Sequence, residues 1–334
     1  MSKLARLRPD NFTIALVCTV VLATALPCRG WAAPVFETLT TFAIALLFFL
    51  HGAKLSREAI LTGMGHWRLH LAVLASTFVL FPAMGLLVQM GPAWAVKPAI
   101  TAGVLYLCLL PSTVQSSIAF TSIAGGNVPA AVCSASASNL IGIFLTPVLA
   151  AVLMGAHGRS GNELTAVEGV ALQLLVPFVA GHLSRPLIGR WIDRHKAVLG
   201  VVDRGSILMV VYTAFSAAVV QGLWSRLSAT DLLAVLIIDG VVLTTALVLT
   251  TIGARLLGFN GADEITIVFC GSKKSLASGV PMAGVLFPAA QVGLLIVPLM
   301  IFHQIQLMVC AVLARHYAAH RRDEAAGRSL EKAA

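Results

Sequence analysis

Charged residues are scarce in this sequence of 334 residues: they make up 11% of it, whereas hydrophobic residues make up 58%. Soluble domains carry about a quarter charged residues, so this composition excludes an ordinary soluble fold. Because a membrane-spanning helix needs about 20 mostly apolar residues, the chain has room for about ten spans but not for a large soluble domain. We therefore expect a lipid bilayer around it and a single polytopic domain, residues 1–334.

Metal-binding and disulfide motifs are also missing. The six cysteines are scattered without any C-x-x-C spacing, which excludes a zinc motif or a disulfide framework, and we expect no cofactor. The net charge of +9 would suit a nucleic acid, but the basic residues lie between apolar runs and not in a patch with aromatic residues. We therefore expect no nucleic-acid partner.

Apolar runs bounded by glycine, proline and charged residues predict ten spans in two sets of five. The first set covers residues 12–28, 35–51, 69–90, 99–123 and 128–153, and the second covers 166–184, 206–224, 232–254, 264–287 and 291–314. The first run follows Lys3, Arg6 and Arg8, as the apolar part of a secretory signal peptide does, but its length favours a retained span.

Basic residues are distributed unevenly around these spans. Two of the 23 Lys and Arg residues, Lys273 and Lys274, fall within a span. Those in loops that a cytoplasmic N-terminus would place outside are Arg29, Lys97, Arg159 and Arg226. All the others lie in inside segments, and this bias predicts that both termini are cytoplasmic, with residues 316–334 as a basic tail.

A weak internal similarity relates the two sets of spans. Matching residues, each 159 positions apart, include Ser116 and Ser275, Gly125 and Gly284, and Pro129 and Pro288. The offset aligns the fourth span with the ninth, although small residues are common enough in membrane helices for a chance match. Because five is an odd number, the second repeat, about 160–315, would be inverted relative to the first, about 10–155, as in many secondary transporters.

The fourth span is interrupted by a proline and a cluster of hydroxyl and amide side chains. Pro111 removes a backbone hydrogen bond, and the carbonyl groups freed in this way are tolerated in a membrane only if they are buried in protein or line a cavity. A simple kink without function is the alternative. The residues expected to line one half of a solute site are Ser112, Thr113, Gln115, Ser116 and Ser117.

The ninth span is interrupted between Cys270 and Gly279 by a segment with two adjacent lysines. One central lysine costs about 2.5–3.5 kcal/mol, and the pair lies too deep to reach solvent by snorkelling. Breaks at corresponding positions of two halves indicate a transport site at the midplane, where free N–H groups of half-helices favour an anion. We expect the other half of this site, with the lysines as anion receptors or coupling switch, to be Gly271, Ser272, Lys273, Lys274 and Ser275.

Other polar residues inside the spans have two interpretations each. Asp239, in the eighth span, is either a counter-ion for the lysines or a group that caps a kink. The polar stripe of the fifth span either faces the fourth span or joins helices by hydrogen bonds, and His303, Gln304 and Gln306 are equally ambiguous. The further site candidates are Asn127, Ser134, Ser138 and Asn139.

Three segments resemble the bile acid:sodium symporter family, most closely its bacterial SBF-like branch. They are FFLHGAKL at 48–55, LPSTVQSSIAFTSIAGGNVPAAVCSASASN at 110–139 and GSKKSLASGVPMAGVLF at 271–287. The resemblance covers nearly the whole chain and implies an all-α protein of a bacterial inner membrane, with ten spans in a five-plus-five inverted repeat. It also implies that spans four and nine cross in a core domain, which moves against a panel of spans one, two, six and seven.

The resemblance has implications for coupling ions as well. In sodium-coupled members, one site uses a Ser-Asn pair with span-five hydroxyls, a second adds a span-three glutamine, and both share a span-nine glutamate. This chain has Ser116 and Ser117 at the pair, Thr77 at the place of the glutamine, and Phe269 to Lys273 where the glutamate is expected. A lysine ammonium is therefore expected in place of sodium, and its deprotonation would couple transport to protons. Sodium near Ser116 and Ser117 is the alternative.

We therefore predict a secondary transporter that carries a small organic anion, sterol-like or carboxylate, by alternating access, and no enzymatic activity. A non-transporting membrane regulator that reuses the fold is the first alternative. An intramembrane hydrolase is the second, because Ser272 and Ser275 flank two lysines as in a Ser-Lys dyad, although no oxyanion motif accompanies them.

Overall fold

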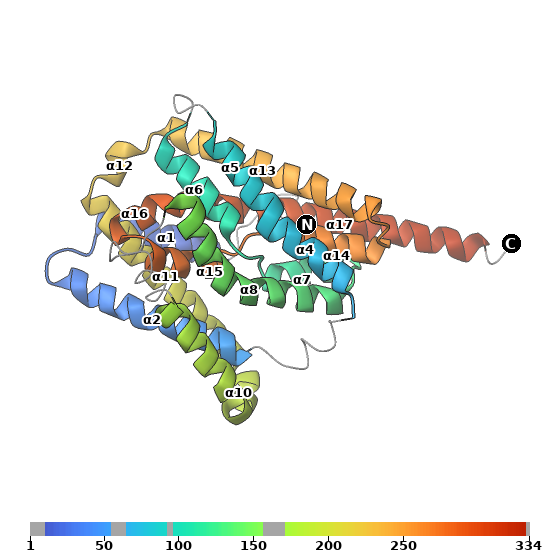
Figure 1. The fold of residues 1–334 in the computed structure, drawn as a ribbon, viewed down its shortest axis with the longest axis horizontal. Helices are drawn as coiled ribbons and strands as arrows, with labels where there is room; N and C mark the ends of the chain where they lie inside the picture. Colours follow the sequence, from blue (N-terminus) through green and yellow to red (C-terminus); the bar gives the residue numbers. More distant parts are fainter. Residues whose placement is uncertain (1–10, 55–64, 92–95, 156–170, 332–334) are drawn as a thin grey trace.

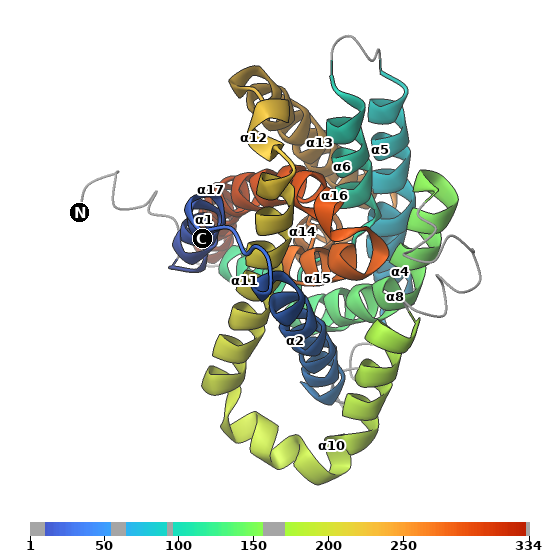
Figure 2. The same cartoon turned by 90° about the vertical axis from the view of Figure 1, so that its left-hand side faces the viewer.

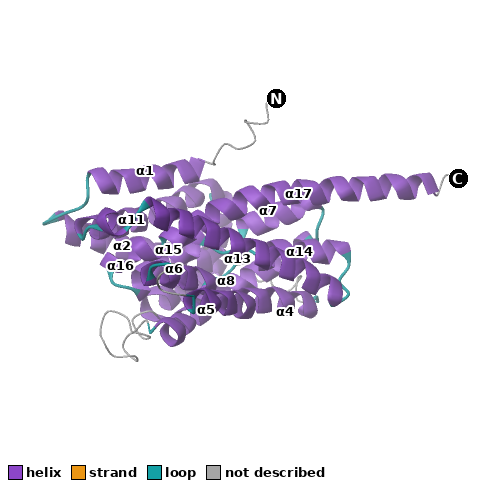
Figure 3. Ribbon diagram, turned by 90° about the horizontal axis from the view of Figure 1, so that it is seen from above, coloured by secondary structure: helices purple, strands orange, loops and turns teal. Residues whose placement is uncertain are grey.

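The computed structural model describes residues 11–54, 65–91, 96–155 and 171–331, and in these ranges it contains helices and loops but no strand (Figure 1, Figure 3). Six helical segments are long and apolar enough to cross a membrane: Ala32–Lys54, Trp67–Gln89, Val128–Met154, Lys196–Val220, Ala229–Leu256 and Ala289–Ala319. Two shorter apolar helices, Asn11–Ala25 and Pro98–Leu109, accompany them. An all-helical, multi-pass membrane protein is thus confirmed.

Each predicted span corresponds to one or more of these helices. In the first half they are α1 (Asn11–Ala25), α2 (Ala32–Lys54), α4 (Trp67–Ala75) continued by the π-helix η2 (Ser76–Leu80) and α5 (Phe81–Gln89), α6 (Pro98–Leu109), α7 (Gln115–Ala124) and α8 (Val128–Met154). In the second half they are η3 (Ala171–Leu175), α10 (Val176–Arg194), α11 (Lys196–Val220), α12 (Leu223–Arg226), α13 (Ala229–Leu256), α14 (Gly261–Gly271), α15 (Leu276–Leu286), α16 (Ala289–Leu295) and α17 (Val297–Glu331).

Three predicted boundaries are wrong. Helix α10 continues to Arg194, well beyond the predicted end of the sixth span at residue 184, although Pro186 lies inside it. Helix α11 begins at Lys196, well before residue 206, because the apolar residues ahead of Asp203 continue the helix. Helix α17 extends to Glu331 and projects beyond the other helices toward the C-terminus, because good helix formers dominate the predicted tail (Figure 1). The predicted start of the sixth span at residue 166 lies outside the described residues, as do the basic residues Lys3, Arg6, Arg8, Arg57 and Arg159.

Helices α1, α2, α10 and α11 pack on one another, and we call this group the panel (Figure 2). The contact between α2 and α10 is close because each helix contributes a glycine. A Cβ atom at Gly52 would lie 1.9 Å from the carbonyl oxygen of Phe178, and one at Gly181 would lie 1.9 Å from that of Phe49. Any larger residue at either glycine would separate the two helices.

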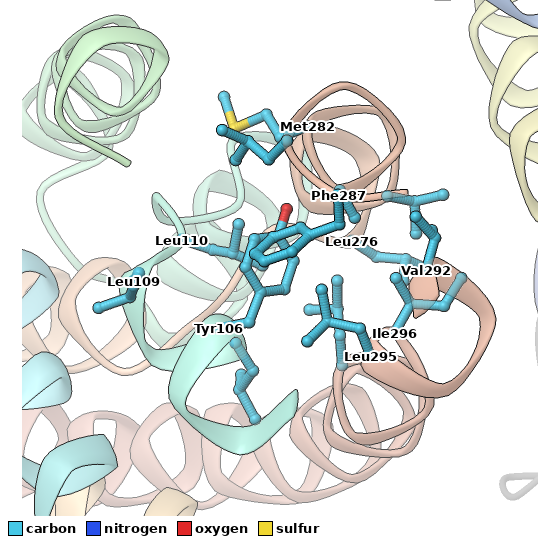
Figure 4. Close-up of a cluster of buried hydrophobic side chains, with 14 of the residues drawn as sticks. Tyr106, Leu109, Leu110, Leu276, Met282, Phe287, Val292, Leu295 and Ile296 are labelled. Atoms are coloured by element: carbon cyan, nitrogen blue, oxygen red, sulfur yellow. The ribbon is translucent and has the colours of Figure 1, made fainter. Parts of the chain in front are cut away.

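The helices α4 to α8 and α13 to α17 form a second group that we call the core bundle, and α11 of the panel packs on α15 and α16 of this group. Figure 4 shows part of its interior, where Tyr106 of α6 lies among apolar side chains of the α15–α16 region. The Tyr106 ring meets that of Phe287 edge to face, with centroids 5.4 Å apart, and its hydroxyl donates to the carbonyl oxygen of Gly279 at 2.6 Å. These contacts fix α15 against α6, and with it the second interruption.

Candidate functional site

The first interruption, residues 110–114, separates α6 from α7. Leu110 has φ −77° and ψ 155° because the ring of the following proline disfavours a helical conformation there. Helix α7 begins at Gln115, and no side chain caps its first turn. The N–H groups of that turn therefore lack helical partners. The predicted break is confirmed, but it ends before Gln115.

The second interruption, residues 272–275, separates α14 from α15. Ser275 caps α15 by accepting a hydrogen bond from the N–H group of Ser278. The N–H group of Ser275 itself donates to the carbonyl oxygen of Pro111 at 2.9 Å. The backbones of the two interruptions are thus in direct contact, and the second break is also shorter than the predicted segment.

Three serine hydroxyls satisfy the carbonyl end of α14, whose last carbonyl groups have no partner within the helix. The donor and acceptor pairs are Ser117 and Phe269 at 3.0 Å, Ser112 and Cys270 at 2.5 Å, and Ser76 and Gly271 at 2.9 Å. Ser112 belongs to the first interruption, and Ser117 lies in the first turn of α7 directly after it. The first interrupted span therefore donates hydrogen bonds to carbonyl groups that the break leaves unpaired in the second.

Lys274 provides the corresponding hydrogen bonds to the end of α6. Its fully buried Nζ atom donates to the carbonyl oxygens of Leu110 at 2.7 Å, Cys108 at 2.9 Å and Thr77 at 2.9 Å. Three carbonyl oxygens match the three N–H donors of an ammonium group. The ring of Phe81, with its centroid 4.2 Å from Nζ, adds a cation–π contact.

Prolines free the oxygens that Lys274 contacts. In η2 the N–H group of Phe81 bonds to the carbonyl oxygen of Ser76, five residues back. The next residue in this register, Pro82, has no N–H group to offer to the carbonyl oxygen of Thr77. Pro111 ends α6, and the N–H group of Ser112, which would pair with the carbonyl oxygen of Cys108 in a continued helix, donates instead to the Ser138 hydroxyl at 3.1 Å. We call the three oxygens, those of Thr77, Cys108 and Leu110, the carbonyl cage.

The neighbouring Lys273 has different surroundings. Its side chain is also fully buried, but its Nζ atom makes no hydrogen bond. Instead it lies 3.8 Å from the centroid of the Phe120 ring and 5.6 Å from that of Phe269. Ring faces compensate the burial of a cation by about 2 kcal/mol, less than a set of three carbonyl groups does.

A cavity of about 520 Å³ lies between the core bundle and the panel. Its core wall is formed by the first turns of α7 and α15 together with α8 and α17. Both helix N-termini therefore bring partial positive charge to this wall. The neutral polar side chains of the wall are Thr113, Gln115, Ser116, Ser136, Asn139, Ser275 and Ser278.

The panel wall of the same cavity carries the charged side chains. Lys54, at the end of α2, forms an ion pair with Asp203 of α11. The next residue, Arg204, has its guanidinium carbon 5.9 Å from the centroid of the Phe12 ring. His51 lines the wall beside them, and the apolar side chains of this wall include Leu47, Phe48, Phe178 and Ile207.

The structure separates the predicted site residues into three groups. Those that line the cavity are Thr113, Gln115, Ser116, Asn139 and Ser275. Those that lie behind it, where the interruptions meet, are Thr77, Ser112, Ser117, Ser138, Gly271, Ser272, Lys273 and Lys274. Asn127 and Ser134 lie elsewhere in the bundle: the Asn127 amide donates to Asp263 at 2.8 Å, and the Ser134 hydroxyl bonds to His70 at 2.7 Å.

Two of the interpretations left open receive no support from the contacts. None of the ion pairs found among the described residues includes Asp239, although this residue is fully buried. The Ser272 hydroxyl donates to the carbonyl oxygen of Val268 at 2.6 Å, and that of Ser275 donates to Ser278 at 3.1 Å. Neither hydroxyl bonds to a lysine amine, so the geometry of a Ser-Lys dyad is not formed in the described residues.

Sequence reasoning missed the charged residues of the panel wall. Asp203 and Arg204 were expected in a loop, and Lys54 was used only as a signal of orientation. The apolar stretch 197–202 was the signal that the helix α11 begins before residue 206 and therefore includes both charged residues. Only the fold brings Lys54 next to Asp203.

Two interrupted helices whose ends meet beside a cavity, in an all-helical membrane protein, define the class of secondary transporters. The sequence matches the SBF-like CPA transporter family over residues 10–319, and the chain belongs to this family. The expected relation to bile acid:sodium symporters is thereby confirmed.

Relatives span nearly the whole chain. Uncharacterized protein PA2026 of Pseudomonas aeruginosa is 62% identical over 326 residues, which cover 98% of both chains. Putative symporter YfeH of Escherichia coli is 59% identical over 308 residues, 92% of both chains. Sodium/bile acid cotransporter 7 of Danio rerio is 29% identical over 320 residues, which cover 94% of this chain and 95% of its own.

Proposed function

We propose that this protein carries a small organic anion across the membrane by alternating access. The observation that supports this most strongly is the cavity, because it adjoins two helix N-termini on one wall and a cluster with Lys54 and Arg204 on the other. Both features favour a negatively charged solute. The names of the relatives, which include symporters and bile acid cotransporters, point to the same class of solute.

Ten spans in a five-plus-five inverted repeat are part of the proposal. The pairs α6–α7 and α14–α15 are the two interrupted spans, and they occupy corresponding places in the two halves of the chain. In this scheme the core bundle moves as a unit against the panel, so that the cavity opens first to one side of the membrane and then to the other. The close packing of α2 on α10 supports a panel that keeps its shape during this motion.

We propose that the core wall contacts the neutral polar part of the solute. Gln115 and Ser116 lie at the uncapped start of α7, and Ser275 lies at the start of α15. Asn139 links α8 to α15, because its Oδ1 atom accepts from the Ser278 hydroxyl at 2.8 Å. A solute bound here would contact both interrupted spans at once.

The proposed coupling ion is a proton and not sodium. The Lys274 ammonium occupies the carbonyl cage, and carbonyl oxygens are the ligands that a sodium ion would require. Lys274 needs all three protons for its hydrogen bonds, whereas the Lys273 amine has no hydrogen bond to lose. We therefore assign proton exchange to Lys273.

The proposed location is the bacterial inner membrane with both termini in the cytoplasm. The distribution of Lys and Arg supports this orientation. Cys28 lies in the loop between α1 and α2, which would then face outside. With the other five cysteines replaced by serine, a membrane-impermeant maleimide added to intact cells is expected to label Cys28. Labelling only after lysis would reverse the orientation.

Uptake by proteoliposomes tests the function. The purified protein is reconstituted, and labelled organic anions are offered under a proton gradient, a sodium gradient or neither. We expect saturable uptake that the proton gradient accelerates and that sodium leaves unchanged. Sodium-dependent uptake would refute the coupling proposal alone. Specific anion binding without flux under any gradient would favour a membrane regulator that reuses the fold.

A further inference from the structure

The panel wall carries a positive charge that no group of the described residues neutralises. Arg204 lines the cavity, and its guanidinium contacts the Phe12 ring but forms none of the hydrogen bonds or ion pairs found in the described residues. The other cation of the wall, Lys54, is paired with Asp203. The three charged groups together therefore leave one net positive charge facing the cavity.

We propose that Arg204 binds the anionic group of the solute. We further propose that Asp203, by pairing with Lys54, keeps Lys54 from binding a second anionic group, so that the site selects organic monoanions over dianions. This inference rests on the proposed transport of organic anions and deepens it by naming the charge of the solute. Arg204 suits this role because its guanidinium presents paired N–H donors that match a carboxylate or sulfonate.

The selection against a second negative charge follows from Asp203. Its Oδ2 atom contacts Lys54, while its Oδ1 atom is buried and has no hydrogen-bond partner. An uncompensated carboxylate oxygen beside the cavity repels another anionic group and favours a hydroxyl or other donor. The solute is therefore expected to carry one anionic group next to Arg204 and a neutral hydrogen-bond donor near Asp203.

The apolar side chains that line the cavity indicate the chemistry of the rest of the solute. Leu47, Phe48 and Phe178 line the panel wall, and Leu140 and Ile143 face them from α8. Burial of apolar surface stabilises a complex by about 25 cal/mol per Å², so these side chains favour an apolar body. Among the described residues the core wall contributes no lysine, arginine or carboxylate side chain, so its attraction for an anion comes from the partial charges of the two helix N-termini.

Two matched pairs of anions test the charge selection with the purified protein. Octanoate and octanedioate share an aliphatic chain, whereas taurolithocholate and its 3-sulfate share a steroid body. Dissociation constants are measured for the wild type, for Arg204→Gln and for Asp203→Asn. Arg315→Gln is the control, because Arg315 is exposed outside the cavity and bonds only within its own helix, to the Ala311 carbonyl oxygen.

We expect the wild type to bind the monoanion of at least one pair more tightly than the dianion. Loss of a charged hydrogen bond should weaken that binding about tenfold or more in Arg204→Gln. In Asp203→Asn, Lys54 becomes free, so the affinity for the dianion should rise about tenfold and the discrimination should disappear. Arg315→Gln should bind as the wild type does.

Two results would overturn the inference while leaving the transport proposal intact: unchanged affinity in Arg204→Gln, or a wild type that prefers the dianion. Failure of the wild type to bind any of the four anions would instead contradict the proposed function, and the inference with it. Because Arg204 makes no hydrogen bond in the described residues, its replacement should not impair folding, which keeps the first result interpretable.

Discussion

Two pairs of cations in this protein have opposite surroundings. Lys273 and Lys274 are fully buried in the core bundle, where backbone oxygens and aromatic rings surround them. Lys54 and Arg204 line the cavity, where a solute has access to them. The groups around a cation, and not its mere presence in a span, therefore indicate whether it stabilises the fold, exchanges a proton or binds a ligand.

The largest effect on stability is expected from Lys274→Met. Three buried carbonyl groups would lose their donor, and each unsatisfied group costs about 1–3 kcal/mol. We therefore expect a loss of about 3 kcal/mol or more in the free energy of unfolding, measured by denaturant titration in detergent. A variant as stable as the wild type would show that the contact of Lys274 with the carbonyl cage does not stabilise the fold.

A smaller loss is expected from Lys54→Met. Asp203 would keep a partly buried carboxylate without its partner, but the two side chains are 30% and 17% exposed, so solvent screens the loss. We expect a decrease of about 1 kcal/mol in the same titration. The double variant Lys54→Met, Asp203→Asn should recover most of it, and no recovery would mean that the ion pair is not the cause.

Lys273→Met should change the free energy of unfolding in the opposite direction. Replacing a buried amine that has no hydrogen bond with an apolar chain of similar length is neutral or stabilising, here by about 1 kcal/mol. The same variant should lose acceleration of uptake by a proton gradient, because the exchanging amine is gone. Proton-driven uptake at the wild-type rate would transfer the coupling role to another residue.

The smallest effect on stability is expected from Arg204→Gln. Its guanidinium makes a ring contact but no hydrogen bond in the described residues, so the free energy of unfolding should change by less than about 0.5 kcal/mol. Normal thermal unfolding of this variant, combined with weak anion binding, would sharpen the contrast with Lys274. A large destabilisation would place Arg204 with the structural cations instead.

Local chemistry made the interruptions predictable from the sequence. A proline within an apolar run and two adjacent lysines in another cannot continue an ordinary membrane helix, so both breaks were located by Pro111 and Lys273. Their contact with each other was likewise expected from the resemblance. The extent of each break was overestimated, because hydroxyl residues such as Ser117 and Ser278 fit into the first turn of the following helix.

The orientation of each helix about its own axis could not be predicted from the sequence in the same way. Whether Ser116 or Ser117 faces the cavity depends on the angle at which α7 begins, and the structure turns Ser117 toward the α14 carbonyl groups. The destination of Lys274 depended on a carbonyl group of Thr77 that Pro82 frees in another span. Such long-range contacts between residues leave no periodic signal in the sequence.

The affinity for an organic anion tests the central contrast most directly. Of the four anions above, the one that the wild type binds best is titrated against wild type, Lys273→Met and Arg204→Gln under identical conditions. We expect an unchanged dissociation constant for Lys273→Met and one about tenfold or more higher for Arg204→Gln. Weakened binding in Lys273→Met together with unchanged binding in Arg204→Gln would contradict it.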